Sequence, residues 1–158
     1  MPVRLLFVCL GNICRSPAAE AVFQHLAEEA GLASRFTVDS AGTGGWHVGD
    51  QADRRMRAAA SARGIAVTSR ARQVAADDFE RFDHIFAMDA DNLRALRALA
   101  PPAGAHKLRL FRDLDPEAPG EDVPDPYTGG PEDFDEVLDI VTRTGRALLA
   151  ELTARRDA

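Results

Sequence analysis

Two kinds of hydrophobic pattern follow one another along the chain: short apolar runs and longer segments of helical spacing. Residues 3–8, with the sequence VRLLFV, are almost continuously apolar, which is typical of a central parallel strand that is buried on both faces. Further strands are predicted at residues 36–40, 83–88 and 107–111. We therefore expect four strands, with the first in the interior of a sheet.

Helices are predicted between and after these strands. Pro17, with Ser16 before it as a cap, is expected to begin a helix that ends near Ala30, before Gly31. The last helix is the clearest, because Pro131 begins it and four acidic residues in its first two turns suit the positive end of the helix dipole. Its apolar face comprises Phe134, Val137, Leu138, Val141, Leu148, Leu149 and Leu152. Other helices are predicted at residues 52–63, 78–81 and 91–99.

The alternation of strands and helices predicts an α/β fold, a single-domain three-layer sandwich in which helices cover both faces of a four-stranded parallel sheet. A length of 158 residues suits one domain over residues 1–158, and there is no repeat, low-complexity tract or linker. Ligands of such folds bind at the carboxyl ends of the strands. Residues 9–16, which follow the first strand, and the long loop at 112–130 are therefore the candidate functional segments.

Charge and composition narrow the class of function. The net charge of −6 argues against broad contact with nucleic acid or anionic lipid, and no apolar run reaches the roughly 18 residues that span a bilayer. The apolar segment at the amino terminus gives way to polar residues too early for a secretory signal, so a cytoplasmic location is expected. Two cysteines are too few for a disulfide scaffold and the four histidines are scattered, so we expect neither a metal nor a cofactor.

The segment CLGNICRS at residues 9–16 carries the main candidate chemistry. Because it joins a strand to a helix, its backbone amides can converge on an anion. Gly11 lets the backbone turn, and Arg15 offers a planar fork for two phosphate oxygens. The predicted phosphate-binding loop after the first strand comprises Leu10, Gly11, Asn12, Ile13, Cys14, Arg15 and Ser16.

Cys9 lies at the base of this predicted cradle. The field that attracts a phosphate also favours a thiolate, and the Ser16 hydroxyl could donate a hydrogen bond to it, so Cys9 would face bound phosphate as a nucleophile. Taken alone, Cys9 could also be an inert core thiol, with Arg15 paired to a surface acid. The joint pattern of strand, cysteine, five residues, arginine, serine and helix favours the nucleophile.

These residues resemble the signature of the low-molecular-weight protein tyrosine phosphatases. The resemblance begins with VCLGNICRSP and continues in the order of that family through DSAGT at 39–43, ARQV at 71–74, FDHIFAMDADNL at 82–93 and VPDPYTGG at 123–130. It covers almost the whole chain. The resemblance implies a metal-independent enzyme that hydrolyses phosphotyrosine through a phosphocysteine intermediate.

A phenolate is a poor leaving group unless it is protonated, so this reaction needs a general acid. The loop at 112–130 offers six carboxylates that the residues alone do not distinguish, and the resemblance selects Asp125. The resemblance also implies that Trp46 and Tyr127 flank the substrate ring, although Trp46 could instead pack in the core. Thr128 stands where many relatives have a second tyrosine, which affects the expected substrate preference.

Three further roles are implied by the resemblance. Asn12 and Ser40 would hydrogen-bond to each other and hold the phosphate loop, although Ser40 could instead cap the end of its strand. Asp89 would be structural and cap the helix that follows it. Cys14 would form a reversible disulfide with Cys9 under peroxide, although it could also be only a small packed residue.

Other functions fit parts of the pattern. Thiol-dependent arsenate reductases share the loop but need downstream cysteines, and the chain has none after Cys14. Related bacterial enzymes that remove phosphate from arginine carry threonine at the position of Ile13. A non-catalytic phosphoprotein-binding or thiol redox-sensing module is disfavoured because the nucleophile, arginine, serine and acid are all present.

We therefore predict a protein tyrosine phosphatase with Cys9, Arg15 and Asp125 as its catalytic residues. The expected partner is a phosphotyrosine-containing protein, with a tyrosine kinase as one candidate. No nucleic acid and no membrane span are expected, and the chain is predicted to be a monomer or a weak dimer.

Overall fold

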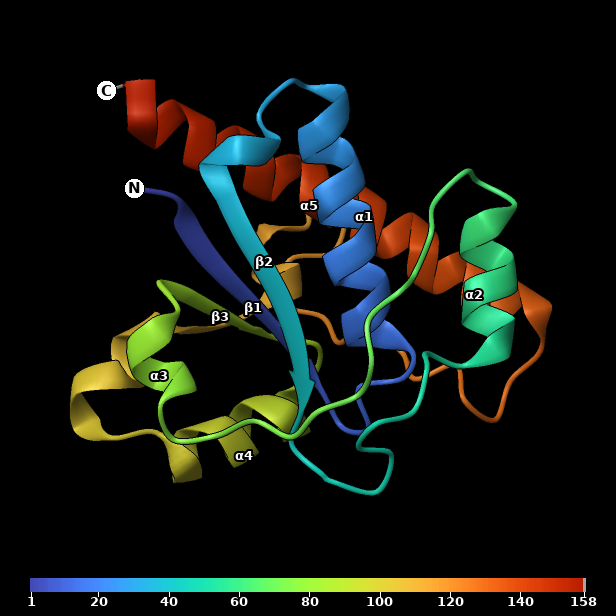
Figure 1. The fold of residues 1–158 in the computed structure, drawn as a ribbon, viewed down its shortest axis with the longest axis horizontal. Coiled ribbons are helices and arrows are strands. Elements are labelled where there is room, and N and C mark those ends of the chain that lie inside the picture. Colours follow the sequence, from blue (N-terminus) through green and yellow to red (C-terminus); the bar gives the residue numbers. More distant parts are fainter. Residues whose placement is uncertain (158) are drawn as a thin grey trace.

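The apolar run at the amino terminus forms an inner strand of a four-stranded parallel sheet in the computed structural model, which describes residues 1–157, with side chains to residue 154. The strand order is β2-β1-β3-β4 (Figure 1). The strands are β1 Val3–Cys9, β2 Phe36–Gly42, β3 His84–Ala87 and β4 Leu108–Leu110. The predicted α/β fold with four parallel strands is confirmed.

Helices cover both faces of the sheet. Helices α1, α2 and α5 lie on one face, and α3 and α4 lie on the other (Figure 1). The α-helices are α1 Arg15–Glu29, α2 Arg54–Ser61, α3 Asp78–Arg81, α4 Ala90–Leu99 and α5 Pro131–Asp157. Short 3-10 helices lie at η1 Ala33–Arg35, η2 Pro102–Lys107 and η3 Phe111–Leu114.

Strand β1 is apolar at nearly every position because both of its faces are covered by helices. Side chains alternate between the two faces of a strand, so Leu5 and Phe7 pack in the cluster with α1 and α5, whereas Leu6 and Val8 pack in the cluster with α3 and α4. All four side chains are fully buried. Each such burial contributes roughly 1.5–3 kcal/mol, which makes β1 the central support for the loop that follows it.

The long loop before α5 is anchored at its start. Phe111 is buried and its ring meets that of Phe7 edge-on, with 5.1 Å between the ring centroids. Arg143 of α5 donates to both carboxylate oxygens of Asp115 at 2.7 and 2.8 Å, and Arg112 donates at 2.9 Å. The pKa of Asp115 lies well below its usual range, and the hydrogen bonds from Arg143 are the main cause. These contacts fix the start of the loop that leads to residues 123–127.

Most element boundaries lie within two residues of prediction, and the largest differences have local causes. Helix α1 begins at Arg15 instead of Pro17, and the predicted capping role of Ser16 is wrong, because its hydroxyl faces the sulfur of Cys9. Helix α2 is shorter than residues 52–63, and it begins at Arg54 because Asp53 caps it, accepting from the backbone N–H of Arg55 at 2.8 Å.

The strand predicted at 107–111 ends at Leu110 because Phe111 begins η3. The short helices η1 and η2 were not predicted. Gly31 adopts a φ of 73° and ends α1 as expected.

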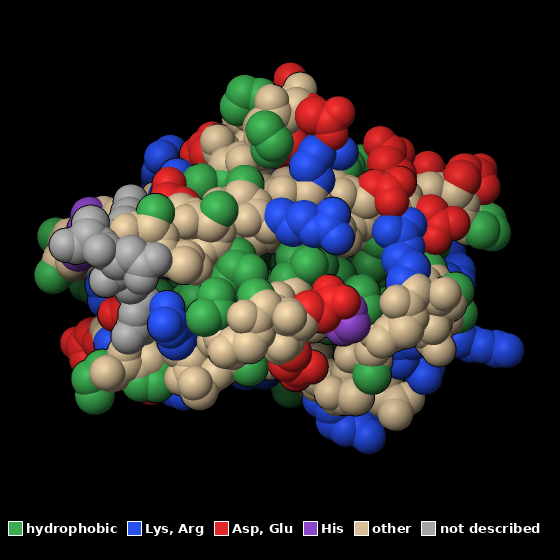
Figure 2. Space-filling model, turned by 90° about the horizontal axis from the view of Figure 1, so that it is seen from above, with side chains coloured by type: hydrophobic (Ala, Val, Ile, Leu, Met, Phe, Trp, Pro, Cys, Tyr) green, Lys and Arg blue, Asp and Glu red, His purple; other side chains and the backbone are tan. Residues whose placement is uncertain are grey.

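Helices α1 and α5 also present an outer face. Figure 2 shows that face, on which hydrophobic side chains gather in a hollow flanked by charged ones. Leu26, Leu32 and Leu149 line this hollow. Within the part of the chain that the structure describes, no helix combines the length and hydropathy of a membrane-spanning segment.

Candidate active site

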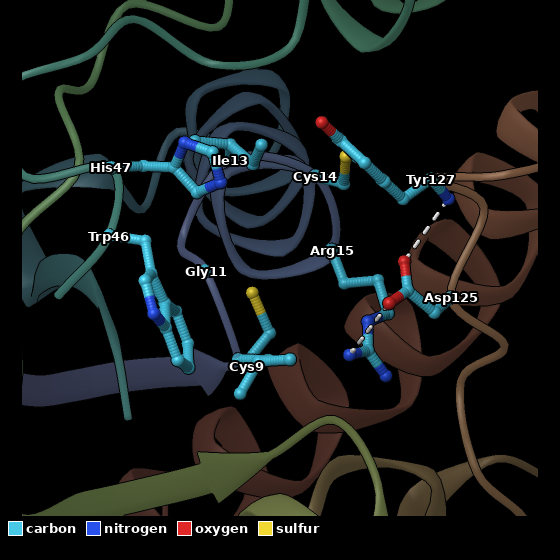
Figure 3. A pocket seen from close by; sticks show the side chains of 10 residues that line it. Cys9, Gly11, Ile13, Cys14, Arg15, Trp46, His47, Asp125 and Tyr127 are labelled. Atoms are coloured by element: carbon cyan, nitrogen blue, oxygen red, sulfur yellow. Dashed lines mark hydrogen bonds and ion pairs between the residues drawn. The ribbon is translucent and has the colours of Figure 1, made fainter. Parts of the chain in front are cut away.

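A cavity of about 190 Å³ opens where β1 ends (Figure 3). Its floor is built by the loop between β1 and α1, and its walls come from two other loops that are far apart in the sequence. The lining residues are Cys9, Leu10, Gly11, Ile13, Cys14, Arg15, Trp46, His47, Asp125 and Tyr127. The structure thus brings the predicted phosphate loop, the predicted acid and both predicted aromatic side chains to one cavity.

The sulfur of Cys9 lies at the floor of this cavity and is hydrogen-bonded to two groups of its own loop. Asn12 donates its backbone N–H to Cys9 Sγ at 3.3 Å, and Ser16 Oγ lies 3.0 Å from the same sulfur. Cys9 is only 3% exposed. A backbone N–H and a hydroxyl of the same loop therefore converge on a nearly buried sulfur.

Asn12 holds the loop in shape from inside. Its φ is 57°, a left-handed conformation that asparagine tolerates better than most residues. The side-chain Nδ2 donates to Ser16 Oγ at 2.8 Å and to Ser40 Oγ at 3.0 Å, and Oδ1 accepts from the backbone N–H of Arg72 at 3.0 Å. These three hydrogen bonds join the loop to β2 and to the segment around residue 72, which offsets the cost of the left-handed backbone.

The end of β2 supports the loop from behind. Thr43 donates its backbone N–H to the carbonyl of Cys9, and Gly44 donates to that of Leu10, both at 2.9 Å. A Cβ at Gly42 would lie only 2.8 Å from the Leu10 carbonyl oxygen. Close approach of the two backbones therefore requires glycine at position 42.

Arg15 is buried at the edge of the cavity and is held by three parts of the fold. Its Nη1 donates to Asp89 Oδ2 at 2.6 Å and to the carbonyl of Val123 at 3.0 Å, and its Nη2 lies 3.8 Å from Asp125 Oδ2. Burial alone would lower the pKa of Arg15, but the negative charges of Cys9, Asp89 and Asp125 outweigh it and raise that pKa. Arg15 therefore remains a fixed cation beside the sulfur.

Asp89 does more than sequence reasoning assigned to it. It caps α4 as expected, accepting from the backbone of Asn92 at 2.7 Å through Oδ1, but Oδ2 also orients Arg15. The available signal was its position two residues after the end of β3, which pairs with β1. An acid at that strand end falls beside the loop that follows β1.

Trp46 and Tyr127 stand on opposite sides of the cavity (Figure 3). Trp46 is 73% exposed, so the alternative that it packs in the core is wrong, and Tyr127 is 48% exposed. The indole lies over Gly44, where a Cβ would overlap the ring. On the other side, the guanidinium of Arg55 lies 5.4 Å from the centroid of the Tyr127 ring and supports it from outside.

His47 is a lining residue that sequence reasoning missed. Its ring approaches Gly11, where a Cβ would lie 3.2 Å from Cδ2, and its Nδ1 lies 3.4 Å from Asp50 Oδ2. The position next to Trp46 was the available signal, because neighbouring loop residues can both face a cavity.

Among the six acids of the long loop, Asp125 lines the cavity. Its Oδ1 accepts from the backbone N–H of Tyr127 at 3.1 Å, and half of its side chain is exposed. Two other acids have structural contacts instead: Asp115 is bound by arginines, and Asp122 accepts from the backbone of Ala90 at 2.9 Å. The geometry separates carboxylates that the residues alone left equivalent.

The two cysteines have different environments, and both are free thiols. Burial, followed by the nearby charges of Asp53 and Cys9, raises the pKa of Cys14 to about 12. Cys14 is therefore a neutral thiol near pH 7.

Comparisons of the sequence and the fold with known proteins point to one family. The family model described as low molecular weight phosphotyrosine protein phosphatase matches residues 4–158. A low molecular weight protein-tyrosine-phosphatase of Streptomyces coelicolor is 50% identical over 153 residues, 95% of this chain and 93% of the relative. A human low molecular weight phosphotyrosine protein phosphatase is 40% identical over 147 residues, 92% of each chain.

A solved structure agrees over the same length. The crystal structure of a protein tyrosine phosphatase from Entamoeba histolytica, with Hepes in its active site, has a TM-score of 0.94 and 43% identity, and the match covers 98% of this chain and 99% of the other. Similarity of sequence and of fold therefore extends over nearly the whole chain. The chain belongs to the low-molecular-weight phosphotyrosine protein phosphatases.

Proposed function

We propose that the protein hydrolyses phosphotyrosine in protein substrates by a two-step mechanism through a phosphocysteine at Cys9, without a metal or a cofactor. The observation that carries this proposal is the position of Cys9 Sγ, which lies on the cavity floor within reach of Asn12 N and Ser16 Oγ. The buried cation of Arg15 beside it supplies the positive charge that a phosphate needs.

In the first step the phosphate enters the loop, where Arg15 and the backbone amides hold its oxygens. The Cys9 thiolate attacks phosphorus, a sulfur–phosphorus bond forms, and the bond from phosphorus to the phenol oxygen breaks. Asp125 gives its proton to the departing oxygen, so that phenol and not phenolate leaves. Arg15 and the amides stabilise the charge on the equatorial oxygens.

In the second step Asp125, now a carboxylate, takes a proton from a water molecule. The water oxygen attacks phosphorus, the bond from phosphorus to Cys9 breaks, and inorganic phosphate and the thiolate are released. Asp125 is suited to both steps because it lies on the open side of the cavity, where leaving group and water enter.

The walls support phosphotyrosine as the substrate. Trp46 and Tyr127 form an aromatic passage to Cys9, and the apolar Ile13 lines the same cavity. A phenyl ring extends far enough to bring its phosphate to the floor, whereas the shorter phosphoserine does not. The partner is then a phosphotyrosine-containing protein, with a tyrosine kinase as one candidate, and we place the protein in the cytoplasm as a monomer or weak dimer.

The test is release of phosphate from a phosphotyrosine peptide in EDTA, with phosphoserine and phosphoarginine substrates alongside. We expect turnover of phosphotyrosine that the Cys9→Ser variant lowers by at least about 10⁴-fold, because the hydroxyl is a far weaker nucleophile than the thiolate. Phosphate binding to that variant, measured by calorimetry, should survive. Turnover that persists in Cys9→Ser, or that EDTA abolishes, would overturn the mechanism.

We further propose that Cys14 protects Cys9 from oxidation. Peroxide would convert the Cys9 thiolate to a sulfenic acid, and the Cys14 thiol would then displace water to form a disulfide that an added thiol reduces. After brief peroxide treatment, dithiothreitol should restore most activity to the wild type and much less to Cys14→Ser. Equal recovery in the two proteins would reject this role.

A further inference from the structure

Glu20 is a partly buried carboxylate that the mechanism above does not use. It lies in α1, and its Oε1 accepts a hydrogen bond from Ser40 Oγ at 2.5 Å. Ser40 is in turn linked through Asn12 and Ser16 to Cys9. A continuous chain of hydrogen bonds therefore joins a carboxylate to the sulfur that we propose as nucleophile, and the inference below rests on that proposed role.

The chain of hydrogen bonds has a direction. A serine hydroxyl has one proton to donate, and Asn12 Nδ2 already donates to both Ser16 Oγ and Ser40 Oγ. Each serine must therefore send its own proton elsewhere. Ser40 sends its proton to Glu20. For the Ser16 proton two acceptors lie in reach, Cys9 Sγ at 3.0 Å and the carbonyl of Ala41 at 3.4 Å, and the sulfur is the nearer.

The competing arrangement is the same asparagine amide turned over. Its Oδ1 would then face the two serines and accept both of their protons, which would withdraw the Ser16 donor from Cys9. Two contacts oppose this flip. The backbone N–H of Arg72 donates to Oδ1 at 3.0 Å, and Glu20 occupies the Ser40 proton that the flipped amide would need.

We propose that Glu20 is a positioning residue for the nucleophile. By accepting the Ser40 proton, Glu20 keeps the Asn12 side-chain amide in its observed orientation. In that orientation Ser16 is free to donate its proton to the Cys9 thiolate. This is an action through other residues, since Glu20 does not line the cavity. Buried hydrogen-bond networks of this kind act as a unit, so a change at one end is felt at the other.

The surroundings of Glu20 make it sensitive to pH near neutrality. Burial raises the pKa of Glu20 to about 7; the Ser40 hydrogen bond opposes that shift, Asp39 adds to it, and Arg72 and Ser69 oppose it. Above this pKa the carboxylate holds the Ser40 proton most strongly. Below it the protonated group is a weaker acceptor, so the hold on the amide relaxes.

The test measures the rate at which iodoacetamide alkylates Cys9 between pH 4 and pH 9, with the modified residue identified by peptide mass spectrometry. We compare wild type with Glu20→Ala, Glu20→Gln and a control, Glu28→Ala, which changes an exposed acid of the same helix. Glu20→Ala should shift the midpoint of the alkylation profile upward by about one pH unit and lower kcat roughly tenfold, as loss of one charge-assisted hydrogen bond implies. Glu20→Gln keeps an acceptor oxygen and should shift it less, and Glu28→Ala should match wild type.

A second comparison separates positioning from a merely structural role. If Glu20 acts through Ser40, replacing it in a Ser40→Ala background should move the alkylation midpoint no further. A lower Tm in Glu20→Ala with an unchanged midpoint would overturn the proposal. If Glu20→Ala does not fold, a Glu20→Gln midpoint equal to wild type would overturn it as well. Alkylation requires no turnover, so this result is independent of the phosphatase assay.

Discussion

The floor of the active site, residues 9–16, and its walls, Trp46, His47, Asp125 and Tyr127, are built in opposite ways. In the floor, Asn12 is 1% exposed, and the polar side chains of Asn12 and Arg15 are hydrogen-bonded to other side chains. In the walls, the aromatic rings and the acid are about half exposed or more. In the mechanism that we propose, the rigid floor would recognise the phosphate group, and the exposed walls would select among phosphorylated residues.

Physical cost explains this division. A buried polar group without a partner costs about 1–3 kcal/mol, so the floor can exist only with its hydrogen bonds complete. Among the side chains that the structure describes, the buried atoms that lack a partner are Asn92 Oδ1 and Thr144 Oγ1, and neither belongs to the floor. The walls carry no such constraint, since water can satisfy them.

The strongest test of the comparison is Arg15→Lys in the floor. The ammonium keeps the charge but cannot reach Asp89, the carbonyl of Val123 and a phosphate together. We expect kcat/KM for p-nitrophenyl phosphate to fall by at least about 10³-fold. Arg54→Lys, at an exposed site at the start of α2, is the matched control. A loss below tenfold would mean that the floor tolerates change as the walls do.

A smaller effect is expected from Asp125→Ala in the wall. Without the acid, kcat for phenyl phosphate should fall about 10²- to 10³-fold, because its phenolate leaves poorly without a proton. The kcat for an aryl phosphate with a good leaving group should fall much less, because such a leaving group departs without a proton. Glu121→Gln, an exposed acid of the same loop, should behave as wild type. Equal losses for both leaving groups would remove Asp125 from the role of general acid.

The smallest effect is expected from Trp46→Ala. Loss of one aromatic contact should raise KM for a phosphotyrosine peptide about tenfold and leave kcat within about twofold. Tm should stay within about 1 °C of wild type, because the indole is exposed and packs on little besides Gly44. Val48→Ala changes an exposed apolar residue of the same loop and serves as control. A fall in kcat with KM unchanged would indicate that the wall takes part in the chemistry.

The fold was predictable where local pattern and burial agree. Strand β1 and helix α5 were predicted within a residue at their starts, because each has a long, consistent apolar pattern with clear end signals. Ser16 shows the limit of such reasoning. Its position before Pro17 suggested a cap, but the hydroxyl is engaged by Cys9 and Asn12, and a tertiary contact of that kind has no local signal.

The candidate site was predictable in its floor and only partly in its walls. Cys9 to Ser16 are contiguous, so their proximity follows from the chain itself. The acid was different, because six carboxylates share one loop and the residues alone do not show which one turns toward the cavity. The double role of Asp89 and the contact of Glu20 with Ser40 depend on how strands and helices pack, which spacing along the chain does not reveal.

Arg15 has a consequence for biosynthesis. Its two short hydrogen bonds reach partners 74 and 108 positions further along the chain. These contacts join distant parts of the chain, and their loop-closure entropy must be overcome before the guanidinium is held beside the sulfur. Cys9 and Arg15 are synthesised more than a hundred residues before Val123, so the contacts that hold Arg15 beside the sulfur are complete only after residue 123 has been synthesised and docked. A nascent or truncated chain therefore carries the thiol without the activity, and catalysis reports on the folding of the entire domain.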